Sequence, residues 1–99
     1  MNVQELMQDT KPVLIDFSAD WCSTCQTMDP ILDEIKILTG DKVNFLKVDI
    51  DKTPQLVSGF HIRSIPTFIF FKDGKLIWRK SGLITKRELL NLIQQYKIS

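Results

Sequence analysis

The sequence predicts a single α/β domain, in which helices cover both faces of a mixed sheet of four strands to give three layers, α/β/α. Two largely apolar segments, 13–17 and 43–48, are separated by a helical pattern. A helix-containing connection between two buried strands favours parallel pairing. Further along, Asp73-Gly74 separates the segments 67–72 and 75–80 and predicts an antiparallel hairpin. Together these observations predict one sheet with both kinds of pairing.

The length and composition of the chain fit one domain over residues 1–99. A chain of 99 residues with 43% hydrophobic side chains can bury a core without a metal or a cross-link. The formal net charge of +1 is too small to attract nucleic acid or a membrane surface, so neither is expected as a partner. No apolar run approaches the roughly 18 residues of a spanning helix, and the opening segment lacks the pattern of a secretory signal. We expect a cytoplasmic monomer, or a periplasmic or extracytoplasmic protein if a leader has been removed.

The chain begins with a predicted short helix over 3–8, followed by the strand 13–17. This strand is apolar throughout except for Asp16, which is the anomaly in it. A carboxylate without a partner inside an apolar strand should have a raised pKa, in the range useful for proton transfer. The alternative is a strand-end residue that is bonded to the backbone.

The second predicted helix runs from Ser23 to about Leu38, where apolar residues recur at helical spacing. Ser23 with Gln26 matches a capping box, which places Cys22 at the helix N-terminus. Pro30 lies inside this pattern and is expected to bend the helix axis.

The remaining elements follow from local signals. Thr53-Pro54 predicts the start of a short helix that Gly59 closes. After the hairpin, Thr85 and Glu88 match a second capping box, and the apolar residues that follow predict a helix covering the sheet. The expected order is α-β-α-β-α-β-β-α, with about four helices.

The pair Cys22 and Cys25 has three possible interpretations, because a lone C-x-x-C is a weak signal. A structural zinc site needs four ligands, whereas the chain offers two cysteines and one histidine, so no metal is expected. A purely stabilising disulfide is disfavoured, because the loop closed by two intervening residues is very short. The third interpretation is redox catalysis.

Helix geometry favours the redox interpretation. Side chains at i and i+3 lie on one helix face, so Cys22 and Cys25 can form a reversible disulfide. Cys22 at the helix N-terminus faces free N–H groups and the positive end of the dipole, which stabilise a thiolate. Cys22 is therefore the predicted nucleophile, and the deeper Cys25 is suited to resolve a mixed disulfide.

Two separate segments resemble the thioredoxin family. The run 13–25, VLIDFSADWCSTC, with Pro30 five residues on, is similar to that family's active-site segment. The run 62–67, IRSIPT, and the hairpin after it resemble the family's cis-proline loop. Lys47-Val48-Asp49 and Gly82 also fit, so the resemblance extends from about residue 13 to the C-terminus and implies a thioredoxin fold.

The resemblance implies roles for further residues. Asp16 corresponds to the buried carboxylate that helps deprotonate the resolving thiol, and Lys47 to the lysine near it. Pro66 corresponds to the cis-proline, which faces the cysteines and leaves the backbone of Ile65 free to bond an extended substrate. The apolar docking rim would then comprise Trp21, Ile65 and Ser81-Gly82-Leu83. Trp21 as an ordinary core residue is the alternative, and Trp78 is expected to have no role in the site.

The chain departs from the family pattern in three places. Ser23-Thr24 stands between the cysteines where reducing thioredoxins carry Gly-Pro, and hydroxyls there are expected to make the couple less reducing. Met1-Asn2 leaves almost no room for an N-terminal strand, so this edge strand is expected to be absent or vestigial. Ser18 replaces a tryptophan common in the family.

The leading functional hypothesis is a thiol–disulfide oxidoreductase that reduces disulfides in other proteins. A separate thioredoxin-reductase-like donor would restore its dithiol, because the sequence has no glycine fingerprint for a nucleotide, and no cofactor is expected. One alternative is an exported thiol-relay domain that accepts electrons from a membrane donor. Another is a non-catalytic thioredoxin-fold interaction module.

Overall fold

The computed structural model describes residues 5, 8 and 10–96. Its elements are, in order, β1 (Val13–Ser18), α2 (Ser23–Thr39), the 3₁₀ turn η1 (Gly40–Lys42), β2 (Asn44–Asp49), α3 (Pro54–Gly59), β3 (Thr67–Lys72), β4 (Lys75–Ser81) and α4 (Lys86–Tyr96). The helix expected over 3–8 falls mainly outside the described residues. Among the residues that are described, no helix is long and apolar enough to cross a membrane.

The four strands form one mixed sheet in the order β2-β1-β3-β4. β1 pairs parallel with β2 and antiparallel with β3, and β3 pairs antiparallel with β4. This confirms the predicted fold class of a four-stranded mixed sheet. The hairpin turn is also as predicted, because Asp73 and Gly74 take the positive φ values of 53° and 76° that a tight two-residue turn requires.

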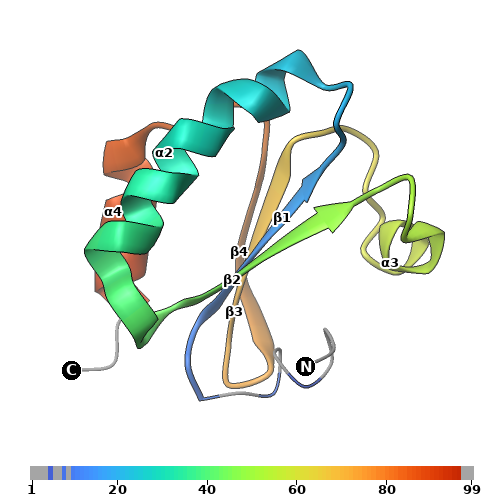
Figure 1. The fold of residues 1–99 in the computed structure, drawn as a ribbon. Coiled ribbons are helices and arrows are strands. Elements are labelled where there is room, and N and C mark those ends of the chain that lie inside the picture. The colour runs from blue at the N-terminus through green and yellow to red at the C-terminus, as the bar shows by residue number, and fades with distance from the viewer. Residues whose placement is uncertain (1–4, 6–7, 9, 97–99) are drawn as a thin grey trace.

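Helices cover both faces of the sheet and give the three expected layers. In Figure 1, α2 and α4 lie together on one face, and α3 lies on the other. Successive side chains of β1 point to opposite faces. Leu14 accordingly belongs to the core under α2 and α4, whereas Val13, Ile15 and Phe17 belong to the core under α3. By the same alternation, Asp16 points toward α2.

The helix termini correct one prediction and confirm another. The capping box expected at Ser23 and Gln26 is wrong: Cys22 is the N-cap of α2, and Gln26 donates its side-chain N–H to the carbonyl oxygen of Asp20 at 2.7 Å. At α4, in contrast, the N–H of Glu88 donates to Thr85 Oγ1 at 3.1 Å, as predicted. The consequence that matters for the site is retained, because Cys22 does lie at the start of α2.

Pro30 lies inside α2, and the helix continues through it to Thr39. Proline carries no N–H and therefore removes one backbone hydrogen bond within the helix. The C-terminus is closed by Gly40, whose φ of 59° is readily adopted by glycine, and whose N–H donates to the carbonyl oxygen of Lys36. Because α2 spans 17 residues, its two ends lie at opposite ends of the domain (Figure 1).

Candidate active site

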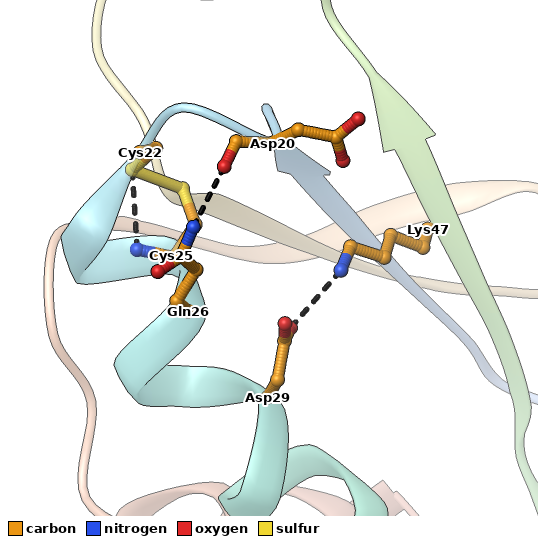
Figure 2. A network of polar contacts seen from close by, with 6 residues as sticks. All are labelled: Asp20, Cys22, Cys25, Gln26, Asp29 and Lys47. Carbon is orange, nitrogen blue, oxygen red and sulfur yellow. Dashed lines mark hydrogen bonds and ion pairs between the residues drawn. A yellow bond between two sulfur atoms is a disulfide. The ribbon is translucent and has the colours of Figure 1, made fainter.

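Cys22 and Cys25 form a disulfide across the first turn of α2 (Figure 2). Their Cα atoms are 5.2 Å apart, as the i, i+3 spacing on one helix face allows. Cys22 is 6% exposed and Cys25 is 3% exposed, so Cys25 is the less accessible residue, as predicted. The two cysteines of the chain are therefore paired with each other in this structure.

The sulfur of Cys22 caps the helix that follows it. The backbone of Cys22 is extended, and its Sγ accepts a hydrogen bond from the N–H of Cys25 at 3.1 Å. The first turn of α2 carries no acidic side chain. A free N–H group and the positive end of the helix dipole both stabilise negative charge on a sulfur at this position.

The hydroxyl of Thr24 lies close to the disulfide. Thr24 Oγ1 lies 3.9 Å from Cys22 Sγ. Because a disulfide sulfur carries no proton, only the hydroxyl can donate across this contact. Ser23 is exposed at the start of the helix, and its carbonyl oxygen accepts from the hydroxyl of Thr27 at 3.1 Å.

The loop that contains Pro66 faces the disulfide. The Ile65–Pro66 peptide bond is cis, as the family resemblance implied. Ile65 packs against the small buried cluster formed by Ala19, Cys22 and Cys25. The structure thus brings this loop and the cysteines together from segments about 40 positions apart in the chain.

Hydrogen bonds join the Pro66 loop to the end of β4. The N–H of Gly82 donates to the carbonyl oxygen of Pro66 at 2.8 Å. The hydroxyl of the fully buried Thr67 donates to the carbonyl oxygen of Ser64 at 2.7 Å and lies 2.9 Å from Ser81 Oγ. Since the single proton of Thr67 is used toward Ser64, the hydroxyl of Ser81 is the donor in the second bond.

Trp21 and Leu83 are large apolar side chains on the surface of the domain. Trp21 is 68% exposed and Leu83 is 56% exposed. The alternative that Trp21 is a core residue is therefore wrong. The indole N–H of Trp21 donates to Asp51 Oδ2 at 2.8 Å, so a carboxylate from the loop after β2 holds the ring. Asp51 was not predicted, because its partner lies 30 positions away in the sequence.

Asp16 is a buried carboxyl group with an unsatisfied oxygen. The residue is 6% exposed, and Asp16 Oδ1 has no hydrogen-bond partner among the described residues. Burial disfavours the charged form and raises the pKa of Asp16 to about 6, although the positive charge of Lys47 acts in the opposite direction. The raised pKa confirms the sequence-based expectation for this residue.

Lys47 lies beside Asp16 on the neighbouring strand, yet its ammonium is bonded elsewhere. Asp16 and Lys47 are partners in the parallel register of β1 and β2. Lys47 Nζ donates to Asp29 Oδ1 of α2 at 3.1 Å, as Figure 2 shows. Asp29 was not predicted, although it lies four residues after Cys25 at the edge of the buried helix face.

A cleft of about 220 Å³ leads to this group of charged residues. It is lined by the side chains of β1, α2 and β2, namely Leu14, Asp16, Asp29, Leu32, Asp33, Lys36, Phe45, Leu46 and Lys47. The cleft lies between the middle of α2 and the strands β1 and β2, on the face of the sheet that Asp16 shares with α2. It gives a buried carboxyl group an opening to solvent.

A redox-active cysteine pair at the start of a helix, opposite a cis-proline loop and on a mixed four-stranded sheet, defines a thiol–disulfide oxidoreductase domain. The Thioredoxin family model matches residues 2–95. This chain belongs to the thioredoxin family.

Curated relatives agree with this assignment. Thioredoxin 1 of Synechococcus elongatus is 39% identical over 93 residues, which cover 94% of this chain and 87% of the relative. The thioredoxin of Rickettsia prowazekii is 43% identical over 91 residues, covering 92% and 87%. The chloroplastic thioredoxin Y2 of Arabidopsis thaliana is 43% identical over 91 residues, covering 91% of this chain. The chain spans about half the length of the chloroplastic relatives, 54% in the case of thioredoxin Y2.

Solved structures show the same fold. A mutant thioredoxin from Halobacterium salinarum NRC-1 superimposes with a TM-score of 0.86 at 30% identity, over 98% of this chain and 84% of that one. Mitochondrial thioredoxin 3 of Saccharomyces cerevisiae, in its oxidized form, gives a TM-score of 0.83 at 30% identity, over 93% and 85%. The thioredoxin fold expected from the sequence is confirmed.

Proposed function

We propose that this domain reduces disulfide bonds in other proteins, with Cys22 as the nucleophile and Cys25 as the resolving thiol. The observation that carries the proposal is the Cys22–Cys25 disulfide at the N-terminus of α2, packed against the Ile65–Pro66 loop. In the dithiol form, the Cys22 thiolate attacks a substrate disulfide, forms a mixed disulfide and releases one substrate thiolate. Cys25 then loses its proton and attacks Cys22 Sγ, which breaks the mixed disulfide and closes the Cys22–Cys25 bond. The substrate leaves as a dithiol.

Asp16 is the proposed acceptor of the Cys25 proton. Its raised pKa, about 6, allows it to bind and release a proton near neutral pH. It lies in β1, next to the strand segment that leads into the cysteines, and its unpartnered oxygen has room for a proton or a water molecule. Lys47 is proposed to adjust the charge of this site from the adjacent strand.

The surface around the disulfide is proposed to bind an extended substrate segment. Its apolar side chains are Trp21, Ile65 and Leu83, and the backbone of Ile65 would pair with the substrate. The residues Pro66, Ser81 and Gly82 complete this docking rim, because their hydrogen bonds keep the two loops together. The hydroxyls of Ser23 and Thr24 are proposed to tune the redox potential.

The electrons for each cycle must come from outside the domain. A turnover leaves Cys22 and Cys25 oxidised, so a separate reductase of the thioredoxin-reductase class is proposed to return them to the dithiol. The domain is proposed to act as a monomer in a reducing compartment, with the cytoplasm as the first candidate, because a dithiol reductant persists where thiols are kept reduced.

Reduction of insulin disulfides in the presence of dithiothreitol tests the proposed function. The wild-type protein is expected to accelerate the appearance of precipitated insulin chains, and Cys22→Ser is expected to abolish the acceleration. Thr27→Val is the control, because Thr27 lies near the start of the same helix and its hydroxyl donates to the carbonyl oxygen of Ser23. Equal acceleration by Cys22→Ser, or none by the wild type, would contradict the proposal.

A further inference from the structure

The cleft lined by Asp16, Asp29 and Lys47 contains an ion pair and a buried carboxyl oxygen that has no partner among the described residues, and the strand register alone does not predict this arrangement. Asp16 and Lys47 are register partners on adjacent parallel strands. Their opposite charges would be expected to pair. Instead, Lys47 Nζ donates to Asp29 Oδ1 at 3.1 Å, and Asp16 Oδ1 has no partner among the described residues.

Asp29 occupies the position from which it can compete for the lysine. It lies one turn after Cys25, is half-buried, and lines the same cleft as Asp16 and Lys47. Figure 2 shows Asp29 on α2 and Lys47 on the neighbouring strand, with the ammonium of Lys47 pointing toward the Asp29 carboxylate. An ammonium that is held by α2 is less available to the carboxyl group on β1.

We propose that Asp29 is a positioning residue for proton transfer: it holds the Lys47 ammonium on the helix side of the cleft and so leaves Asp16 free to take the proton of Cys25. This inference rests on the proposed function, in which Asp16 is the proton acceptor. It adds a second residue of α2 to a site that already comprises Asp16 of β1, Lys47 of β2 and Cys25 of α2. Asp29 acts through Lys47 and contacts neither sulfur nor substrate.

The charges that face Asp16 from each packed element agree with this role. From β2, Lys47 lowers the pKa of Asp16; from α2, Asp29 raises it and Lys36 lowers it. The hydrogen bond to Asp29 is also the chief reason why the pKa of Lys47 is raised. Loss of the Asp29 charge therefore acts twice in one direction, because it removes a negative neighbour and frees a positive one.

The test is the side-chain carboxyl pKa of Asp16, followed by ¹³C NMR across a pH titration of the oxidised protein. Asp29→Asn keeps the size of the side chain and removes its charge, and it is expected to lower the pKa of Asp16 relative to wild type. Asp33→Asn is the matched control, because Asp33 lines the same cleft on the same helix, whereas Lys47 is bonded to Asp29, and it should give a clearly smaller change. An unchanged or raised value in Asp29→Asn, or an equal decrease in Asp33→Asn, would overturn the inference.

A second background separates positioning from a direct charge effect. In Lys47→Met, the ammonium is absent, so Asp29→Asn should change the pKa of Asp16 much less than it does in the wild-type background. The same change in both backgrounds would mean that Asp29 acts on Asp16 without Lys47, and the positioning role would be wrong.

The rate of insulin reduction by Asp16→Asn tests the role of Asp16 independently of Asp29. If Asp16→Asn reduces insulin as fast as wild type near neutral pH, the proposed proton transfer fails, while the titration still reports whether Asp29 controls Lys47. If Asp16→Asn is slow and Asp29→Asn moves the pH dependence of the rate to lower pH, both proposals hold.

Discussion

Asp16 and Lys47 lie opposite each other on neighbouring parallel strands, but the lysine pairs with Asp29 and one oxygen of Asp16 is buried without a partner among the described residues. A buried carboxyl group of this kind destabilises a fold when it is ionised. Its retention in an inner strand of the sheet is consistent with a chemical role rather than a structural one.

Asp16→Asn is expected to stabilise the oxidised protein at neutral and alkaline pH. The folded-state pKa of about 6 lies above the ordinary aspartate pKa of 3.8, so between these pH values the folded state keeps a proton that the unfolded state has lost. Wild-type stability therefore falls as pH rises through this window and stays lower above it. Asparagine cannot ionise, and its advantage should reach about 2–3 kcal/mol above the window.

Urea unfolding of both oxidised proteins at about pH 4 and about pH 8 measures this difference. Asp16→Asn and wild type should be closer in stability at the acidic pH. An advantage of the variant that is the same at both pH values would show that ionisation of Asp16 is not its cause.

The double variant Ser23→Gly/Thr24→Pro is expected to be a stronger reductant than wild type. Thr24 Oγ1 lies 3.9 Å from Cys22 Sγ and can donate to a thiolate there, which stabilises the reduced form. Glycine and proline offer no such donor. A decrease in potential of about 30 mV, tenfold in the equilibrium constant, is expected on equilibration with glutathione. An equal or higher potential in the double variant would contradict the role given to these hydroxyls.

Ser81→Ala is expected to weaken substrate binding rather than the chemical step. Its hydroxyl donates to the buried Thr67, whose own proton bonds Ser64, and these bonds link the two loops of the docking rim. Loss of one such bond, worth about 1 kcal/mol, should raise KM for insulin about fivefold with little change in kcat. Ser81→Thr keeps a hydroxyl and should restore KM; if both variants lower kcat alone, the loops do not serve binding.

Asp51→Ala is expected to release the exposed ring of Trp21. The indole N–H donates to Asp51 Oδ2 at 2.8 Å. Because Trp21 is 68% exposed, packing holds its ring only weakly, and this hydrogen bond orders it. Without the carboxylate, KM for insulin should rise a few-fold, because the ring must be ordered on binding. Asp41→Ala, in η1 at the far end of α2, is the matched control. A similar KM in Asp51→Ala and Asp41→Ala would show that the hydrogen bond from Trp21 to Asp51 does not contribute to substrate binding.

The elements predicted best from the sequence are those whose cause lies within a few residues. The Asp73-Gly74 turn and the Thr85 cap are examples, because backbone φ or a hydroxyl three residues from an N–H decides each one. The capping box predicted at Ser23 was wrong, and the cause again lies within a few residues. The sulfur of Cys22, one residue earlier, accepts the Cys25 N–H, and the sequence rule considers only oxygen acceptors.

The parts that the sequence did not predict depend on contacts between distant segments. Asp29 meets Lys47 across 18 positions, and Asp51 meets Trp21 across 30. The cis bond before Pro66 was expected from family resemblance alone, since most X–Pro bonds are trans. The cysteine pair was the exception among site residues, because its spacing, its place at a helix start and its chemistry all follow from one short segment.

Trapping of a mixed disulfide tests whether Cys22 is the nucleophile and Cys25 the resolving thiol. Cys25→Ser retains the nucleophile and lacks the resolving thiol, so it should accumulate a covalent complex with insulin that is joined through Cys22. Mass spectrometry under non-reducing conditions detects this complex. Cys22→Ser should give little or none of this complex under the same conditions. A complex formed equally well through Cys25 in Cys22→Ser, or no complex in Cys25→Ser, would contradict the assignment of the two thiols.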